Sequence, residues 1–256
     1  MKVSIITACY NRASSIACAI QSVLVQDYPD IEYIIVDGAS SDGSQNIIES
    51  SIKNAPSNIT IQYISEPDHG MYEAINKGIR MATGDVIALC HSDDCIYDDH
   101  VVSNYVRCFE TNDVDLVYSD GVFVNSNNDK LVRVWKSGRY SQRKVRNGWL
   151  PLHPTCYIKR ALFDRLGLYD ESYKIAADTD LLVRYLLRDD VKVVYLSGRY
   201  VVKMSMGGLS TDTSKRKKMW DEDMRVYSSN GFRFPIITKL KKMIRKIPQF
   251  ILAKIS

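Results

Sequence analysis

The sequence predicts an α/β fold in which a mostly parallel central sheet carries helices on both faces. Within the first 120 residues, short runs of β-branched residues alternate with longer segments of helical period. This alternation is typical of strand, helix, strand units, which build a parallel sheet. The chain of 256 residues is 45% apolar and 25% charged, a composition typical of a globular protein with a full hydrophobic core.

The expected elements follow one another regularly as far as residue 120. Strands are expected at residues 3–8, 31–36, 59–64, 86–90 and 115–118, and helices at 13–27, 43–53, 71–82 and 98–111. Beyond this point residues 121–135 alternate like a hairpin with its turn at 125–129, and residues 138–149 are polar and loop-like. Helical period returns at 161–166, at 181–187 and in a final segment from Phe234.

Acidic residues follow three of the predicted strands. Asp37, Asp68 and the pair Asp93 and Asp94 lie within four residues of a strand end, and ligands of open parallel sheets bind beyond the carboxyl ends of the strands. Grouped carboxylates are costly unless a cation or a ligand balances their charge. A hard divalent cation, held by one or two carboxylates and by substrate phosphates, meets that need.

The first strand is not followed by a glycine-rich phosphate loop. Residues 7–12 read Thr-Ala-Cys-Tyr-Asn-Arg, which lacks the Gly-x-Gly-x-x-Gly pattern of dinucleotide dehydrogenases, and no Walker-type loop is present. The pattern therefore favours a nucleotide whose diphosphate is bound through a metal.

Seven short motifs in a fixed order closely resemble those of the family 2 inverting glycosyltransferases. They are TACYNR at 7–12, VDGASSDGS at 36–44, EPDHGMYEAINKG at 66–78, SDD at 92–94, HPT at 153–155, ADTDL at 177–181 and GGLS at 207–210. Each motif is weak alone, but their joint occurrence in this order is highly specific. The resemblance covers roughly residues 1–210 and implies the GT-A fold, a Rossmann-like sheet.

This resemblance implies a role for each matching residue. The donor site for a nucleotide sugar would comprise Thr7, Tyr10, Asn11, Asp37, Asp68, Lys77 and Asp93. Asp94 would bind the metal, Mn²⁺ or Mg²⁺, because serine replaces the first acidic residue of the family's Asp-x-Asp element. Asp178 would be the catalytic base, and His153 and Trp149 would lie on the acceptor side. Lys203 or the basic run 215–218 is a further candidate to face the diphosphate, although that run is also typical of a solvated surface.

The same residues have structural interpretations that remain open at this level. Asp178 or Asp180 could cap the helix expected at 181–187. Asp93 and Asp94 alone would more often form an exposed turn than a metal site. His153 precedes a proline and could be an ordinary loop residue.

Charge is distributed unevenly along the chain. All 30 acidic residues lie at or before Asp223, whereas 8 of the 34 basic residues follow it, so the first 223 residues carry −4 and the remainder +8. We therefore expect three regions: a nucleotide-sugar-binding half at 1–120, an acceptor-binding and catalytic-base half of the same domain at 121–222, and a basic amphipathic C-terminal helix within 223–256.

The C-terminal segment has apolar residues at near-helical spacing, with basic residues largely on the opposite side. Pro248 is expected to kink or end this helix near Ile247. Because the segment contains no acidic residue, it favours an anionic membrane surface through residues 234–256 over packing on its own domain. Nucleic acid is not an expected partner, since basic aromatic platforms are missing.

Cysteine spacing and hydropathy indicate the compartment. The six cysteines form no C-x-x-C pair, so free thiols in a reducing compartment are expected. The first residues lack a signal-peptide core, and no stretch has the length of a spanning helix. We therefore expect a cytoplasmic protein that is peripheral on the inner face of the plasma membrane.

These observations together predict a metal-dependent inverting glycosyltransferase, with hexose the expected sugar. It would move a sugar from a nucleoside diphosphate donor, a UDP-sugar, to a hydroxyl of a lipid-linked glycan in bacterial O-antigen or capsule assembly. A catalytically silent sugar-nucleotide or glycan-binding module is the alternative from another class. A nucleotidyltransferase is less favoured, because it needs a glycine-rich triphosphate loop after the first strand.

Overall fold

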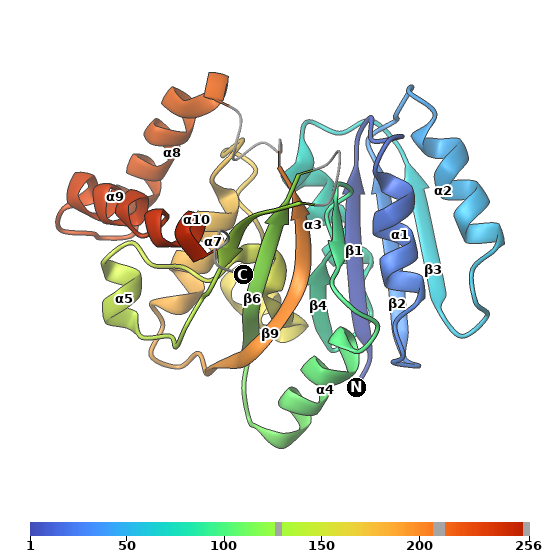
Figure 1. The fold of residues 1–256 in the computed structure, drawn as a ribbon, viewed down its shortest axis with the longest axis horizontal. Coiled ribbons are helices and arrows are strands. Elements are labelled where there is room, and N and C mark those ends of the chain that lie inside the picture. Colours follow the sequence, from blue (N-terminus) through green and yellow to red (C-terminus); the bar gives the residue numbers. More distant parts are fainter. Residues whose placement is uncertain (126–129, 207–212, 253–256) are drawn as a thin grey trace.

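A computed structural model describes residues 1–125, 130–206 and 213–252, whose strands form one nine-stranded mixed sheet (Figure 1). The strand order is β3-β2-β1-β4-β8-β6-β9-β5, and β7 pairs with β6 outside this path. The strands are β1 (Val3–Cys9), β2 (Ile31–Asp37), β3 (Thr60–Ser65), β4 (Val86–Leu89), β5 (Asp94–Ile96), β6 (Leu116–Val124), β7 (Leu131–Trp135), β8 (Tyr157–Lys159) and β9 (Val193–Ser205).

The first four strands are parallel, as the alternation predicts. In their register, Cys9 pairs with Asp37, and Asp37 pairs with Ser65. The strands β1, β2 and β3 therefore end in one row, and β4 runs beside β1 in the same direction. This shared edge brings the segments that follow these strands close together.

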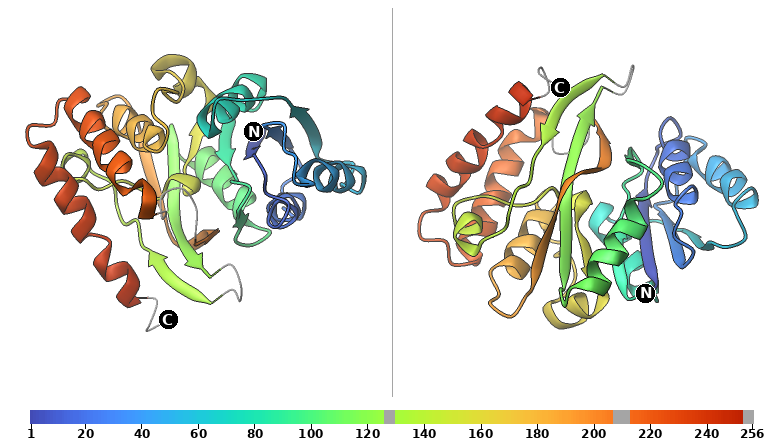
Figure 2. Two further views of the ribbon diagram at one scale, coloured as in Figure 1. Left: turned by 90° about the horizontal axis from the view of Figure 1, so that it is seen from above. Right: turned by 60° about the horizontal axis from the view of Figure 1, so that its bottom comes forward.

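Helices cover both faces of the sheet (Figures 1 and 2). One face packs against α1 (Ile16–Leu24), α2 (Ser44–Lys53) and α4 (Val101–Thr111). The other packs against α3 (Met71–Met81), α6 (Arg160–Leu166) and α7 (Ala177–Leu186). Because side chains alternate along each strand, neighbouring residues of β2 contribute to different cores: Tyr33 to the first and Ile34 to the second.

The second half of the sheet departs from the predicted alternation. The hairpin at 121–135 is confirmed, with Gly121 paired to Trp135, although part of its turn lies outside the described residues. Strand β9, which the sequence reading missed, runs parallel to β6. Its polar residues at 197–199 interrupt the apolar pattern. The Ser119 hydroxyl donates to the Leu196 and Arg199 carbonyls at 2.6 and 2.9 Å, which accommodates the irregular register there.

Short or late elements complete the chain. These are α5 (Gln142–Arg146), inside the segment expected to be a loop, the 3-10 turns η1 (His153–Thr155) and η2 (Thr213–Lys215), and the helices α8 (Arg216–Ser229), α9 (Pro235–Ile244) and α10 (Ile247–Leu252). The interruption between α9 and α10 agrees with the break expected near Pro248. Across the described residues, no helix has the length and apolar character needed to cross a membrane.

The C-terminal helices pack on the body of the protein, whereas the sequence reading favoured membrane binding over packing. Gly148 has φ +78°, and a Cβ at this position would lie 2.5 Å from the Thr238 carbonyl oxygen of α9. The Lys241 ammonium donates to the Asn147 side chain at 2.6 Å. One side of α9 packs against the domain, and the apolar residues on its other side remain exposed.

Candidate functional site

A cavity of about 420 Å³ lies at the carboxyl-end edge of the sheet. Its lining includes residues after β1, β3 and β4, the start of α7, and side chains of β7, α8 and α9. Of the residues expected in the site, Tyr10, Asp68, Asp93, Asp94, His153 and Asp178 line this cavity. Segments that are far apart in the sequence therefore line one cavity that opens to the surface.

One wall of the cavity is formed by Tyr10 and Asp68 around Gly38. A Cβ on Gly38 would lie 2.5 Å from Asp68 Oδ2 and 3.2 Å from Tyr10 Cδ2, so only glycine permits this approach. Tyr10 is 62% exposed, which leaves its ring available for stacking. Lys77 does not line the cavity.

Lys77 instead holds the loop that carries Asp68. Its ammonium group lies 3.0 Å from Glu66 and 3.3 Å from Glu73, and it donates to the Pro67 carbonyl at 3.2 Å. Lys77 is therefore a positioning residue in this geometry.

Thr7, Asn11 and Asp37 do not line the cavity either, because their polar atoms are bonded within its walls. Asp37 is fully buried and accepts hydrogen bonds from Ser40 N at 2.9 Å and from the Ser65 hydroxyl at 2.7 Å. The Thr7 hydroxyl donates to the Cys90 carbonyl at 2.7 Å. Asn11, at φ 52°, accepts from the backbone N–H of residue 41 at 2.9 Å. Asp37 and Asn11 therefore fix the turns that follow β1 and β2, and Thr7 links β1 to the end of β4.

Asp94 is a buried carboxylate with an unsatisfied oxygen. Its Oδ1 accepts from Ser205 N at 3.3 Å, whereas Oδ2 has no hydrogen-bond partner among the described residues. Burial and the charge of Asp93 raise the pKa of Asp94 well above its ordinary value. A buried acceptor without a partner is costly. A hard divalent cation would satisfy this oxygen, so the Asp93 and Asp94 carboxylates fit the metal that the sequence motif implies.

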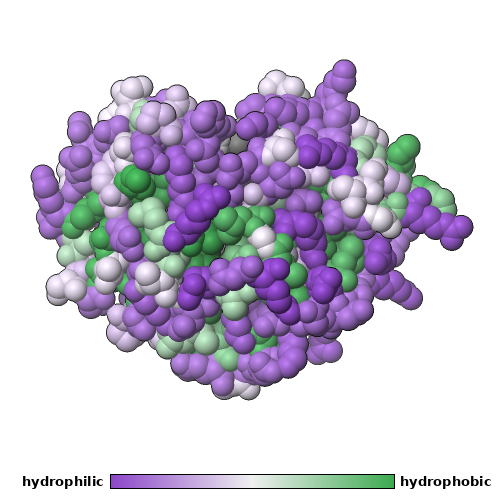
Figure 3. Space-filling model, turned by 180° about the vertical axis from the view of Figure 1, so that it is seen from behind, coloured by the Kyte–Doolittle hydropathy of each residue, from purple (hydrophilic) through white to green (hydrophobic). Residues whose placement is uncertain are grey.

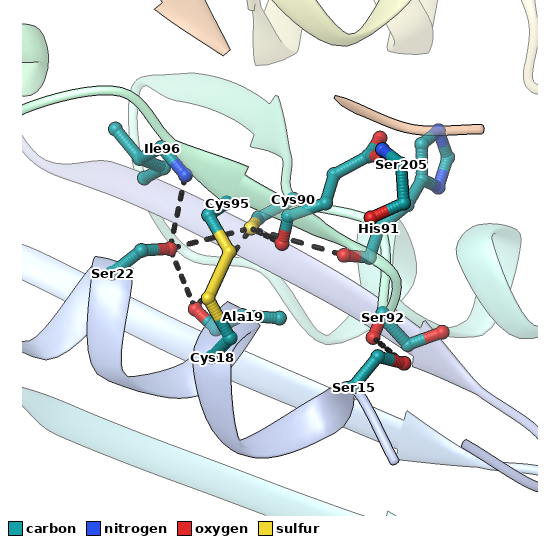
Figure 4. Close-up of a disulfide and its surroundings, with 11 residues drawn as sticks. Ser15, Cys18, Ala19, Ser22, Cys90, His91, Ser92, Cys95, Ile96 and Ser205 are labelled. Carbon is teal, nitrogen blue, oxygen red and sulfur yellow. Dashed lines mark hydrogen bonds between the residues drawn. A yellow bond between two sulfur atoms is a disulfide. The ribbon is translucent and has the colours of Figure 1, made fainter. Parts of the chain in front are cut away.

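The loop that carries Asp93 and Asp94 is tied to α1 (Figure 4). The Ser15 hydroxyl donates to the Ser92 carbonyl at 2.9 Å, and Ile96 N donates to the Ser22 hydroxyl at 3.0 Å. Cys18 and Cys95 form a disulfide between α1 and β5.

The expectation that all six cysteines are free thiols is therefore wrong for Cys18 and Cys95. The other four are free and buried: Cys9, Cys90, Cys108 and Cys156. Spacing could not reveal the pair, because 77 residues separate its members and only the packing of α1 against β5 brings them together.

Asp178 lies in the first turn of α7 and lines the cavity. Its Oδ1 accepts from Thr179 N at 2.6 Å. Burial raises the pKa of the Asp178 carboxyl, while the charge of Lys242 opposes that rise. A half-buried carboxylate with a raised pKa that faces a cavity has the properties of a general base.

Glu222 of α8 binds the segment that leads into α7. Its carboxylate accepts from the backbone N–H groups of Lys174, Ile175 and Ala176 at 3.1, 2.8 and 2.9 Å. Asp180 instead pairs with Arg184 at 2.7 Å. Neither contact involves Asp178, which lines the cavity and accepts from Thr179 N through Oδ1.

A second buried acidic residue of α8 binds the C-terminal helix. Asp223 is 1% exposed, and it forms ion pairs with Lys239 and, at 3.0 Å, with Lys242. The Lys242 ammonium also lies 3.2 Å from the Thr179 hydroxyl, next to Asp178. The sequence did not predict a role for these residues. The position of Asp223, as the last acidic residue before a basic segment, could have indicated an ion pair with that segment.

His153 lies at the cavity as expected, but Trp149 does not. His153 Nε2 is 2.7 Å from the Tyr169 hydroxyl, and burial, with a contribution from His91, lowers the pKa of His153 to about 3. The ring is therefore neutral at physiological pH. Trp149 is buried, and its indole N–H donates to the Ser137 carbonyl at 2.8 Å. Leu150 and Leu152 line the cavity near this position instead.

The GGLS motif at 207–210 lies outside the described residues. Lys203, on β9, is not among the residues that line the cavity, and neither is the run 215–218.

The arrangement of the sheet and helices is the GT-A fold of glycosyltransferases. The chain belongs to glycosyl transferase family 2, whose family model matches residues 4–168. It is 31% identical over 209 residues to an uncharacterized glycosyltransferase of Rickettsia typhi, covering 78% of this chain and 63% of that protein. It is 27% identical over 208 residues to a PGL/p-HBAD biosynthesis glycosyltransferase of Mycobacterium bovis, covering 81% and 78%.

Some relatives are much longer than the chain. An uncharacterized glycosyltransferase of Nostoc sp. is 39% identical over 114 residues, which are 44% of this chain and 34% of that protein. Among solved structures, S. aureus TarS 1–349 in complex with UDP-GlcNAc has a TM-score of 0.67 at 18% identity, covering 99% of this chain and 79% of that one. The mannosyltransferase PcManGT from Pyrobaculum calidifontis, in complex with GDP-Man and Mn²⁺, has a TM-score of 0.70 at 17% identity, covering 98% and 73%. The longer TarS structure is covered to 39%.

Proposed function

We propose that the protein transfers a hexose, with inversion, from a nucleoside diphosphate donor to a hydroxyl of a lipid-linked glycan. The observation that carries this proposal is that Asp94, with its unsatisfied buried oxygen, and Asp178 line the same cavity. One carboxylate suits a cation beside a departing diphosphate, and the other suits a base for the acceptor. A silent binding module has no need for a buried unpaired carboxylate oxygen, whose burial is costly.

The donor is a UDP-sugar in this proposal. The exposed ring of Tyr10 provides a stacking surface for the base. Asp68 lies beside it to contact the nucleoside, and Asp93 is placed to contact the ribose or the donor sugar. The UDP-GlcNAc complex of TarS supports a uridine donor by analogy of fold.

A divalent ion, Mn²⁺ or Mg²⁺, would be held by Asp94 with Asp93 beside it. When bound, such an ion neutralises charge on the diphosphate leaving group. No group of three acidic, histidine or cysteine ligands occurs in the part of the chain that the structure describes. A site with two carboxylates suits an ion that completes its coordination with substrate phosphates and water.

Asp178 removes the acceptor proton in the transfer step. The acceptor O–H bond breaks and its proton passes to the Asp178 carboxylate, while the acceptor oxygen forms a bond to the anomeric carbon. The bond from that carbon to the donor phosphate breaks, and its electron pair leaves with the nucleoside diphosphate. Attack opposite the leaving group through an oxocarbenium-like state inverts the anomeric configuration.

The acceptor side adjoins a surface suited to an anionic membrane. The outer side of the C-terminal helices carries exposed apolar residues, 47–63% exposed: Phe234, Ile236, Ile237, Leu240, Met243, Ile244 and Ile247. Figure 3 shows hydrophobic side chains at the edge formed by the C-terminal helices. Since residues 224–256 carry +8 and no acidic residue, an anionic lipid surface complements them.

We therefore propose a cytoplasmic enzyme, peripheral on the inner face of the plasma membrane, that acts in bacterial O-antigen or capsule assembly. Donor hydrolysis is the most accessible test, because it needs no acceptor lipid. A panel of nucleotide sugars with Mn²⁺ or Mg²⁺ should reveal slow hydrolysis of one UDP-sugar, and Asp94→Ala should abolish it. Absence of hydrolysis and of thermal protection by every nucleotide sugar would refute the proposal.

A further inference from the structure

Four cationic side chains gather on the wall of the cavity next to Asp178. They are Arg133 of β7, Lys239 and Lys242 of α9, and Lys246 between α9 and α10. The acidic residues that face them are Asp223 and Asp178, of which Asp223 already pairs with Lys239 and Lys242. The wall therefore holds more positive than negative charge in a partly buried place.

Arg133 is buried with an unused donor. It is 6% exposed, and its guanidinium lies 4.6 Å from the ring centroids of both Phe123 and Trp135. Its Nε donates to Gln249 Oε1 at 2.6 Å, but Nη2 is buried and has no hydrogen-bond partner within the described ranges. Since a buried charged donor without a partner is costly, this geometry suits an anionic ligand that enters the cavity.

Lys246 is the second cation that lacks a partner. Its ammonium group makes no hydrogen bond or ion pair with any residue that the structure describes. Burial and the nearby charges of Lys242, Arg133 and Lys239 lower the pKa of Lys246 to about 8. Lys246 therefore lies near the other three cations, and an anion that joins them would relieve the repulsion that Asp223 leaves uncompensated.

This cluster is separate from the Asp93 and Asp94 edge. Asp94 of β5 pairs with Met204 of β9, Met204 pairs with Phe123 of β6, and Phe123 pairs with Arg133 of β7. Three strand spacings of about 4.8 Å put the Arg133 backbone about 14 Å from the Asp94 backbone along the sheet. Donor hydrolysis distinguishes an acceptor phosphate from the donor diphosphate at this cluster, and the Arg133 backbone does not adjoin the Asp94 edge.

The cluster lies instead on the side of the acceptor. Lys242 is 3.2 Å from the hydroxyl of Thr179, the neighbour of Asp178. An acceptor whose hydroxyl faces Asp178 and whose phosphate faces this cluster has little more than one sugar ring between the two groups. The helices that carry the lysines expose their apolar side to the outside, where a lipid chain could continue into a membrane.

We propose that Arg133, Lys242 and Lys246 bind the phosphate groups of the acceptor, a lipid diphosphate that carries a single sugar. This inference rests on the proposed function, and it names the acceptor class for the same cavity. It also places the reaction in a sequence. A preceding reaction must transfer a sugar 1-phosphate to a lipid phosphate, and this enzyme then adds the second sugar.

Binding of farnesyl diphosphate tests the site without turnover. The full chain is titrated in neutral detergent with a metal chelator present, so that the metal-dependent donor site does not hold the diphosphate. We expect farnesyl diphosphate to bind at least tenfold more tightly than farnesol. Lys246→Met should weaken the diphosphate at least tenfold, and Arg245→Met, which removes an exposed charge from the adjacent position, should leave it unchanged. Equal affinities in the wild type and in Lys246→Met would overturn the inference.

Turnover separates this inference from the proposed function. With a lipid diphosphate monosaccharide as acceptor, Lys246→Met should raise KM at least tenfold. With an alkyl glycoside of the same sugar, and in donor hydrolysis, the variant should match the wild type. If the wild type neither transfers a sugar nor hydrolyses a donor, the proposed function fails. If the wild type transfers and Lys246→Met is unimpaired on both acceptors, only the phosphate site fails.

Discussion

The two halves of the cavity are built in different ways. In the first 120 residues the site follows the sheet: β1, β2 and β3 end in register, and the acidic residues lie at or shortly after strand ends. In the second half the site follows tertiary contacts, because Glu222 and Asp223 of α8 hold the start of α7 and the C-terminal helix in place. A strand end can be located from the sequence, whereas a buried polar contact between distant helices cannot.

The largest predicted effect on activity concerns Asp178, which lies in the second half of the cavity. Asp178→Asn should lower kcat by about 10²–10⁴-fold, because a positioned general base contributes that much. Folding and donor binding should persist, since asparagine keeps an Oδ1 that can accept from Thr179 N, and Glu222 binds the backbone before α7. Steady-state kinetics and thermal protection by the donor measure the two properties. Turnover close to that of the wild type would exclude Asp178 as the base.

Removal of residues 234–256 tests how far the second half depends on its last helices. Asp223 would lose its partners Lys239 and Lys242 and the cover of α9, and loss of a buried pair costs up to about 3–5 kcal/mol in the free energy of unfolding. Urea unfolding should detect this loss, and Asp223→Asn in the shortened chain should recover part of it. Sedimentation with anionic liposomes should also fall. A shortened chain as stable as the full chain would mean that the Asp223 contacts do not stabilise the fold. That result would agree with the sequence-based expectation that the C-terminal helix does not pack on its own domain.

Glu222→Gln sharpens the comparison with a smaller change. The substitution weakens three charge-assisted hydrogen bonds to the backbone before α7, and the expected loss of unfolding free energy is about 1–3 kcal/mol. Because α7 carries Asp178, kcat should fall while the KM for the donor stays near the wild-type value. Asp221→Asn, one residue earlier and exposed, is the matched control. An equal effect in both variants would argue against a positioning role for Glu222.

The smallest effect concerns the pH dependence of turnover. Asp178 acts as a base only when deprotonated, so activity is lost as the pH falls through its pKa. Burial raises that pKa, while Lys242 opposes the rise and the charge of Asp223 adds to it. Lys242→Met should therefore move the acidic limb of kcat against pH to higher pH. A limb that stays in place, or moves to lower pH, would mean that Lys242 does not act on the base.

The sequence predicted the parallel strands and the positions of Asp94 and Asp178, because both rest on local patterns and motif order. It did not predict that the polar atoms of Thr7 and Asp37 are bonded to Cys90 and Ser65, which are distant in the sequence. We expected the basic residues of the C-terminal helix to be exposed to solvent. Lys239 is instead 7% exposed, and it forms an ion pair with the buried Asp223. Such pairings depend on which helices pack together, and periodicity does not contain that information.

The central claim is that one cavity unites a cation site at Asp94 with a base at Asp178. It is tested most directly by measuring thermal protection and transfer together, with the donor and Mn²⁺, for the wild type, Asp94→Ala and Asp178→Asn. We predict that Asp178→Asn keeps the metal-enhanced protection and loses transfer by about 10²-fold or more, whereas Asp94→Ala loses both. Transfer retained in Asp178→Asn, or metal-enhanced protection retained in Asp94→Ala, would contradict this account.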